Sequence, residues 1–74
     1  MAKIGVLTLS DRASAGVYAD ESGIAIQNIL KEWVIGDLEF IYRVIPDDYE
    51  LIVNSLEQMC EQGCDIVFTT GGTG

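Results

Sequence analysis

The apolar segment KIGVLTLS at residues 3–10 is the feature that most limits what this chain can fold into. Four of its residues are large and aliphatic, namely Ile4, Val6, Leu7 and Leu9. A nearly continuous apolar run of this length is typical of a strand that is covered on both faces, as in a parallel sheet. A chain of 74 residues has room for one small domain at most. The sequence therefore predicts a single small domain that contains a buried parallel strand near its N-terminus.

The segments that follow alternate between helical and extended patterns. Residues 21–34 carry apolar side chains at helical spacing, and residues 38–45 (LEFIYRVI) alternate as in a strand nearer the sheet edge. A second helix is predicted to begin at Asp47 and to end at Gly63, and residues 65–70 (DIVFTT) form the last strand. The predicted buried stripes are Ile26, Ile29, Leu30 and Trp33 in the first helix, and Ile52, Leu56, Met59 and Cys60 in the second.

The order strand, helix, strand, helix, strand predicts an α/β fold with parallel strands and right-handed crossovers. If the two crossovers leave the first strand in opposite directions, the strand order is 2-1-3 and the helices cover both faces. The result is a three-layer α/β/α domain. A sheet of this kind has its ligand crevice at the carboxyl ends of the strands, at the switch point between strands 1 and 3.

Two polar loops are predicted to meet at that crevice. Ser10, Asp11 and Arg12 follow the first strand, and TTGGTG at residues 69–74 ends the last one. A glycine-rich turn after a buried parallel strand can direct several N–H groups at an anion. The turn is not a P-loop, because no Lys-Ser or Lys-Thr follows the glycines, and it contains no GxGxxG pattern. From the residues alone, a tight structural turn and a phosphate-binding loop both remain open.

Asp47 also has two interpretations. Asp47 and Glu50 have the spacing of a helix capping box, a role that would stabilise the chain by about 1 kcal/mol. The same aspartate would stand at the carboxyl end of the second strand, beside the crevice, where its oxygens could hold Mg²⁺. Spacing alone favours the cap. Asp48, the next residue, is predicted to be solvated.

The charge of the chain narrows the choice of partners. Its formal net charge is −8, and its four Lys and Arg residues are scattered along the sequence. Nucleic-acid binding depends on clustered cations, so a nucleic-acid partner is not expected. An anionic ligand would need backbone N–H groups or a metal ion to offset the repulsion. The sequence shows neither a signal peptide pattern nor a run of 18 apolar residues, which predicts a cytoplasmic protein without a membrane partner.

The cysteines give no sign of a metal centre. Cys60 and Cys64 are four residues apart, and the chain contains no histidine and no second cysteine pair. A zinc site would need more ligands than these, and a Ser-His-Asp triad would need a histidine. We expect Cys60 to be a core residue and Cys64 to be half-buried beside a strand.

Three segments together resemble a known family. IGVLTLSDRASAGVYADESG, IPDD and DIVFTTGGTG, in this order and spacing, are similar to the N-terminal part of the molybdopterin adenylyltransferases. This bacterial group is related to the G domain of gephyrin and to its plant counterpart. The resemblance implies a molybdopterin-binding-like fold. It also implies that residues 1–74 are the N-terminal portion of a single molybdopterin-binding domain, truncated after the glycine-rich loop.

The resemblance further implies an activity in molybdenum cofactor biosynthesis. Enzymes of this family use Mg²⁺ and ATP to transfer AMP to the terminal phosphate of molybdopterin with release of pyrophosphate, and they are commonly homotrimers. Asp47 matches a catalytic carboxylate of the family, with a role in metal binding, and Ser10 and Asp11 match residues that line the pocket. The residues matched to the loop that binds the pterin phosphate or the nucleotide are Thr70, Gly71, Gly72, Thr73 and Gly74.

The match also has departures and competitors. Members of the family carry a second essential aspartate beyond the glycine-rich loop, so the 74 residues alone are expected to be inactive. A non-catalytic molybdopterin-binding or scaffolding module of the gephyrin type would keep trimer contacts but would not need Asp47. A nucleotide hydrolase of the competence-damage type shares the GGTG loop, but it usually carries Gly-Asp-Glu where this chain has Ser10, Asp11 and Arg12.

Overall fold

The computed structural model describes residues 2–16, 19–34 and 36–71. The strands in this part of the chain are β1 (Ala2–Leu9), β2 (Leu38–Ile45) and β3 (Ile66–Gly71). The helices are α1 (Asp11–Ser14), α2 (Glu21–Trp33) and α3 (Tyr49–Glu61). None of the described helices is both long enough and apolar enough to cross a membrane.

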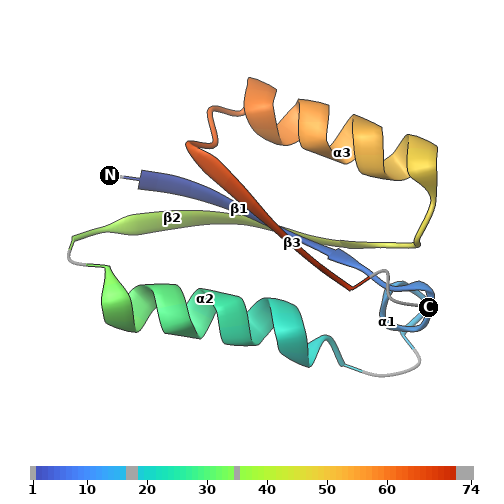
Figure 1. Ribbon diagram of the computed structural model, residues 1–74, viewed down its shortest axis with the longest axis horizontal. Helices are drawn as coiled ribbons and strands as arrows, with labels where there is room; N and C mark the ends of the chain where they lie inside the picture. The colour runs from blue at the N-terminus through green and yellow to red at the C-terminus, as the bar shows by residue number, and fades with distance from the viewer. Residues whose placement is uncertain (1, 17–18, 35, 72–74) are drawn as a thin grey trace.

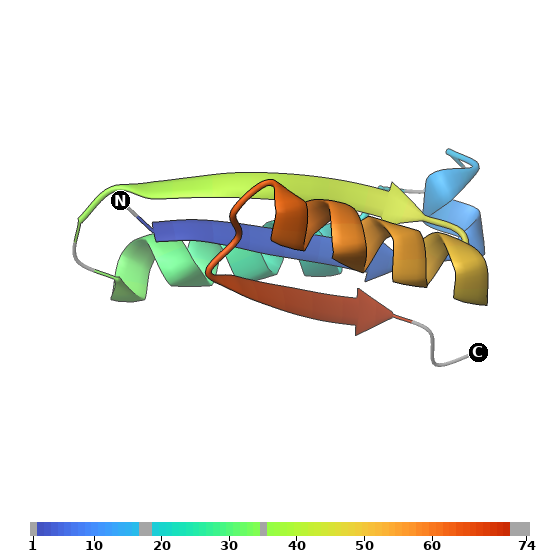
Figure 2. The same cartoon turned by 90° about the horizontal axis from the view of Figure 1, so that it is seen from above.

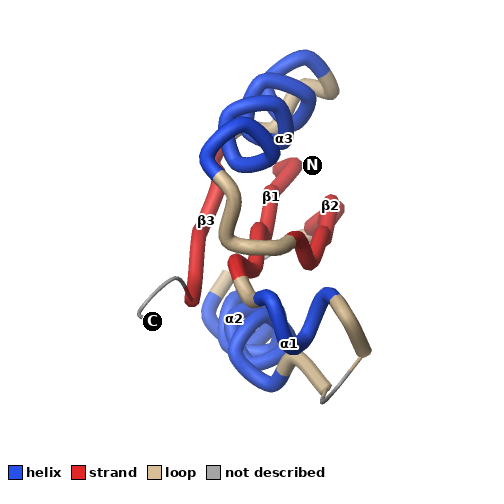
Figure 3. The backbone as a smooth tube through the Cα atoms, turned by 90° about the vertical axis from the view of Figure 1, so that its right-hand side faces the viewer, coloured by secondary structure: helices blue, strands red, loops and turns tan. Residues whose placement is uncertain are grey.

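The strands form one parallel sheet in the order β2-β1-β3, which confirms the predicted order 2-1-3. The central strand pairs with β2 along its whole length, from Ala2 opposite Leu38 to Leu9 opposite Ile45. Helix α3 covers one face of the sheet and α2 covers the other, with the sheet between them (Figure 1). The end-on view shows the same three layers, with α1 on the side of α2 (Figure 3). The predicted three-layer α/β/α arrangement is therefore confirmed.

The core lies around β1, as its apolar sequence predicts. Val6 and Leu7 are completely buried, and Met59 of α3 is equally buried against this strand. Gly5 allows α3 to pack this closely, because a Cβ atom there would lie 2.9 Å from the Met59 sulfur. Figure 2 shows α3 lying over the sheet with its chain direction opposite to that of the strands. Burial of β1 on both faces fixes the sheet, and so fixes where the strand ends lie.

The start of α3 differs from the prediction by one residue. Asp48, not Asp47, is the N-cap, and its carboxylate accepts from the backbone N–H of Leu51 at 3.1 Å. Asp47 lies in a turn in which the Asp48 N–H donates to the Pro46 carbonyl at 2.9 Å, so the helix begins after it. Glu50 is then the second helical residue, too early for the predicted capping box. Asp48 is exposed, as predicted, although it caps the helix.

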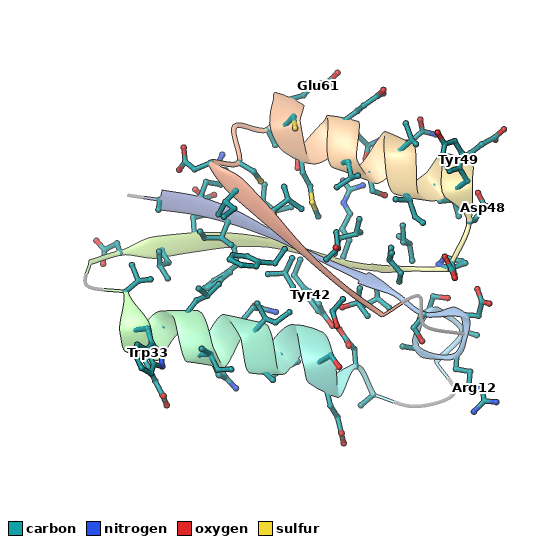
Figure 4. All side chains as sticks on the ribbon, in the orientation of Figure 1. Arg12, Trp33, Tyr42, Asp48, Tyr49 and Glu61 are labelled. Atoms are coloured by element: carbon teal, nitrogen blue, oxygen red, sulfur yellow. The ribbon has the colours of Figure 1, made fainter. Side chains whose placement is uncertain are left out.

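Three of the predicted core positions are wrong. Ile29 and Trp33 are 54% and 80% exposed, and Figure 4 shows Trp33 pointing away from the sheet at the end of α2. The Lys31 ammonium lies over the Phe40 ring of β2, 5.7 Å from its centroid, so this flank of α2 faces β2. Helical geometry then places Ile29 and Trp33 on the opposite flank, which the three described strands do not cover.

The third wrong position is Cys60, which is exposed, whereas Cys64 is half-buried as predicted. The buried stripe of α3 runs through Ser55 and Met59 instead. Five helical positions separate Ser55 from Cys60, and this spacing turns Cys60 toward the side of the helix. Burial, opposed by the nearby Lys3 ammonium, raises the pKa of the Cys64 thiol.

Candidate functional site

The carboxyl ends of the strands enclose one side of an open pocket with a volume of about 690 Å³. Its lining comes from the end of β1, from α1, from the start of α2, from the β2–α3 loop and from the end of β3. The lining residues are 8–13, 19–22, 47, 70 and 71. The parallel pairing explains this convergence, because Thr8 lies opposite Thr70 and Leu9 lies opposite Gly71. The predicted meeting of the two loops at one edge is therefore observed.

The structure brings together every predicted site residue that it describes. Ser10, Asp11, Asp47, Thr70 and Gly71 all line this pocket. The remaining predicted residues of the glycine-rich loop, Gly72, Thr73 and Gly74, lie outside the described residues. Arg12 also contributes to the lining, and its side chain extends outward from α1 (Figure 4).

The loop after β1 is shaped by Ser10. Its hydroxyl oxygen accepts from the Ala13 N–H at 3.2 Å and so caps α1, and its own backbone N–H donates to the Ile45 carbonyl at 2.9 Å. The polar segment that was predicted to be a loop after the first strand thus contains a short helix at Asp11–Ser14, because a serine before a helical turn satisfies one of the free N–H groups. Ser10 thus fixes the direction in which the chain leaves β1.

The surroundings of Gly71 give a structural reason for the first glycine of the glycine-rich segment. Its φ is +91°, and a Cβ atom there would lie 2.2 Å from the Leu9 carbonyl oxygen. No other residue fits this backbone without strain or collision. The close approach of β3 to β1 is therefore sufficient reason for a glycine at position 71, whatever the following glycines bind.

Asp47 presents an exposed carboxylate at the rim of the pocket. Its backbone N–H donates to Asp11 Oδ1 at 2.9 Å. Because Asp48 serves as the helix cap, the Asp47 carboxylate is not used for capping. No hydrogen bond or ion pair to this carboxylate occurs within residues 2–16, 19–34 and 36–71. Asp47 is thus available to a ligand or a metal ion.

Asp20 is a pocket residue that was not among the predicted site residues. Its carboxylate accepts from the Thr8 hydroxyl at 2.7 Å, from the Gly23 N–H at 3.2 Å, and from the Tyr42 hydroxyl. Figure 4 shows Tyr42 extending from the sheet toward α2. This carboxylate therefore joins β1, β2 and α2 beside the pocket.

The charges of this cluster follow from these contacts. Burial opposes ionisation of Asp20, but the hydrogen bonds from Tyr42, Thr8 and Gly23 outweigh it and lower its pKa below 3.8. Burial, the hydrogen bond to Asp20 and the charge of Asp20 raise the pKa of Tyr42 from 10.0 to about 12. At neutral pH the pair is therefore a carboxylate and a neutral phenol, and the carboxylate is already fully engaged by donors.

The pocket as a whole is negatively charged. Asp11, Asp20, Glu21 and Asp47 contribute carboxylates, and Arg12 is the cation among the described lining residues. No group of three or more Asp, Glu, Cys or His side chains that could hold a metal ion occurs in the described part of the chain. The oxygens of Asp47 nevertheless suit Mg²⁺, which is usually held by one or two carboxylates together with water and substrate phosphates. An anionic ligand in this pocket would bring the remaining oxygen ligands with it.

Known proteins resemble this chain in sequence. The family described as "Probable molybdopterin binding domain" matches residues 5–74. The molybdopterin adenylyltransferase of Helicobacter pylori (strain ATCC 700392 / 26695) is 54% identical over 72 residues, which cover 96% of this chain and 41% of that protein. The molybdopterin adenylyltransferase of Escherichia coli (strain K12) is 41% identical over 73 residues, which cover 97% of this chain and 37% of that protein. The chain thus spans about two fifths of the length of the curated relatives it matches.

The fold has a solved counterpart. The tungsten cofactor synthesizing protein MoaB from Pyrococcus furiosus matches with a TM-score of 0.83 and 36% sequence identity. The match covers 100% of this chain and 44% of that chain. This similarity confirms the α/β fold class that the alternation of strands and helices predicts.

Proposed function

The chain belongs to the family of probable molybdopterin-binding domains, and from this premise we propose that it forms the N-terminal part of a molybdopterin adenylyltransferase active site. The reaction transfers AMP from ATP to the terminal phosphate of molybdopterin and releases pyrophosphate. The observation that supports this proposal most directly is the exposed Asp47 carboxylate on the rim that Thr70 and Gly71 share. The main demands of phosphoryl transfer are the positioning of polyanions and the neutralisation of their charge, and a carboxylate at this rim can hold the cation that does both.

Each part of the pocket has a role in this proposal. The end of β3, with Thr70 and Gly71, and the glycine-rich segment after it bind a phosphate group of molybdopterin or of the nucleotide. Ser10 and Asp11 line the pocket at the end of β1. The N-terminus of α2 also borders the pocket, where the positive end of the helix dipole adds positive potential.

Asp47 is the proposed catalytic carboxylate and the proposed ligand of Mg²⁺. When bound, Mg²⁺ supplies charge neutralisation for the phosphates at the reacting centre. Asp47 holds its carboxylate at the rim, with no helix-capping duty to divide it. The negative charge of the lining makes a cation necessary, because Asp11, Asp20 and Glu21 would otherwise repel a triphosphate.

The proposal applies to a protein that also contains the counterpart of the rest of the relatives' length. Residues 1–74 as one portion of a single molybdopterin-binding domain, a homotrimeric assembly and a cytoplasmic location are parts of the same proposal. We expect the 74 residues alone to bind Mg²⁺-ATP without transferring AMP, because they match only 41% of the H. pylori enzyme.

A chimera tests the proposed activity. This chain replaces the 72 matching residues of the H. pylori molybdopterin adenylyltransferase, and transfer of AMP to molybdopterin is followed by release of pyrophosphate. The variant Asp47→Asn is compared with Asp48→Asn, which makes the same change of charge at the neighbouring residue. Asparagine is as good a helix cap as aspartate, so Asp48→Asn preserves the start of α3.

We expect the unmutated chimera and Asp48→Asn to be active, and Asp47→Asn to lose activity at least about 100-fold. Equal activity of the two variants would contradict the catalytic assignment and favour a non-catalytic binding module. Breakdown of pyridine nucleotides without AMP transfer would instead favour the competence-damage type of hydrolase.

A further inference from the structure

Two hydrogen bonds join Ser10 and Asp11, which follow β1, to the end of β2 and to the β2–α3 loop at the rim of the pocket. The Ser10 N–H donates to the Ile45 carbonyl, and the Asp47 N–H donates to Asp11 Oδ1, both at 2.9 Å. Asp11 and Asp47 are 36 residues apart in the sequence. Their contact is therefore tertiary, and it fixes the start of α1 relative to the β2–α3 loop.

Asp47 is held from three directions, and each contact acts on the backbone around it. The Asp48 N–H donates to the Pro46 carbonyl, and this turn encloses Asp47. The Asp48 carboxylate accepts from the Leu51 N–H and so anchors the start of α3. Asp11 supplies the contact to the peptide N–H of Asp47 itself. Among the described residues, no hydrogen bond or ion pair acts on the Asp47 carboxylate, so its direction depends on this peptide.

The charge of Asp11 needs an explanation, because a second carboxylate beside Asp47 repels it. If Asp11 were a metal ligand, its negative charge would be essential. If Asp11 positions Asp47, an acceptor oxygen at the place of Oδ1 is essential and the charge is not. The structure engages Oδ1 of Asp11 with the Asp47 N–H, which is the contact that the second interpretation requires.

We propose that Asp11 is a positioning residue, which orients the Asp47 carboxylate by holding the Asp47 peptide through Oδ1. This inference rests on the proposed function, since it presumes that Asp47 serves the ligand. It assigns Asp11 a role different from the pocket contact that the family resemblance implies.

The test exchanges the charge and the acceptor separately. Asp11→Asn keeps an oxygen at the Oδ1 position and removes the charge, whereas Asp11→Glu keeps the charge and moves the oxygen by one methylene group. Ser14→Ala is the matched control, because it removes an α1 hydrogen bond from Ser14 Oγ to the Asp11 carbonyl at 3.0 Å and leaves the carboxylate untouched. Both exchanges at Asp11 are small and exposed, so all variants should fold.

Two measurements are made on each variant of the 74-residue chain. The first is the hydrogen-exchange rate of the Asp47 amide, measured by NMR without ligand. The second is the affinity for Mg²⁺-ATP, measured by calorimetry. Asp11→Asn and Ser14→Ala should stay within about threefold of the wild type in both, whereas Asp11→Glu should speed the exchange and weaken the affinity by about tenfold each.

The opposite order of affinities, with Asp11→Glu binding well and Asp11→Asn binding poorly, would show that Asp11 acts through its charge and would overturn the inference. An Asp47 amide that exchanges equally fast in the wild type and in Asp11→Glu would also overturn it. Absence of Mg²⁺-ATP binding in the wild type would count against the proposed function, while the exchange rates would still decide whether Asp11 holds the Asp47 peptide.

Discussion

Replacing Gly23 with alanine tests how tightly α2 is joined to the sheet beside the pocket. Gly23 is buried in the first turn of α2. A Cβ atom at this position would lie 2.3 Å from Asp20 Oδ2, 2.7 Å from the Thr8 hydroxyl oxygen and 2.8 Å from a Tyr42 ring carbon. The Asp20 oxygen accepts from both Thr8 and Tyr42, so it cannot move away without weakening these hydrogen bonds.

The magnitude follows from three contributions. Overpacking a filled site costs about 1–3 kcal/mol. Weakening two hydrogen bonds costs about 1 kcal/mol each. Alanine is the better helix former by about 1 kcal/mol, which offsets part of this loss. We therefore expect Gly23→Ala to lower the free energy of unfolding by about 2–4 kcal/mol, a large share of the roughly 5 kcal/mol typical of a small domain.

Urea denaturation followed by circular dichroism measures this change. Asn28→Ala is the control, because Asn28 is exposed in the same helix and gains propensity without a collision. It should leave the free energy of unfolding unchanged or raise it by about 0.5 kcal/mol. If Gly23→Ala is as stable as the wild type or more stable, α2 does not pack on Thr8 and Tyr42 as described, and the reasoning is wrong.

Three further variants test other features. Protonated Tyr42 stabilises the fold below pH 10.0, its ordinary pKa, and this contribution is lost as the pH rises toward about 12, so the gap in Tm between wild type and Tyr42→Phe should shrink over that range. Asp20, whose pKa is lowered, contributes stability above pH 3.8 that is lost below it, and Asp20→Asn should weaken the acid dependence of Tm. Gly71→Ala should destabilise the chain by more than about 2 kcal/mol in urea, because φ is +91° and the Leu9 carbonyl blocks a Cβ atom; an unchanged midpoint would contradict this backbone. Trp33→Ser should change the free energy of unfolding by less than about 0.5 kcal/mol, because the indole is 80% exposed, and a loss of several kcal/mol would restore the predicted core role.

The sequence predicted the sheet well because the aliphatic composition of β1 determines its place in the sheet. A run of aliphatic residues covered on both faces leaves little choice but a central parallel strand, and the two crossovers then fix the order β2-β1-β3. The same topology allowed the convergence at one rim to be predicted without knowledge of any contact. The residues that converge are Ser10, Asp11, Asp47, Thr70 and Gly71.

The errors lie where a local pattern has to compete with tertiary contacts. The cap was assigned to Asp47 because Glu50 follows it at capping-box spacing. In the structure the Asp47 N–H donates to Asp11, which is 36 residues away, and no local pattern reveals that contact. Trp33 has the right helical spacing for the core, but spacing cannot tell how far the described sheet extends beneath the helix.

The contribution of Asp20 was missed for a related reason. An aspartate before a helix is adequately explained as a cap, and Asp20 does cap α2. Its bonds to Thr8 and Tyr42 depend on how the helix is placed on the sheet, which no spacing in the sequence reveals. The α/β topology did offer one indication, because a helix that follows a parallel strand begins at the carboxyl edge of the sheet, where the crevice was predicted.

The central claim is that the carboxyl ends of the parallel strands bind a phosphorylated ligand. Titration of Mg²⁺-ATP into the isotopically labelled chain, followed by amide chemical shifts, tests it directly. We expect the largest shifts at Ser10, Asp11, Asp47 and Gly71. Lys3 and Asp65, which are joined to each other at the opposite end of the sheet, should stay unchanged. Shifts concentrated at Lys3 and Asp65, or no shifts at saturating nucleotide, would contradict it.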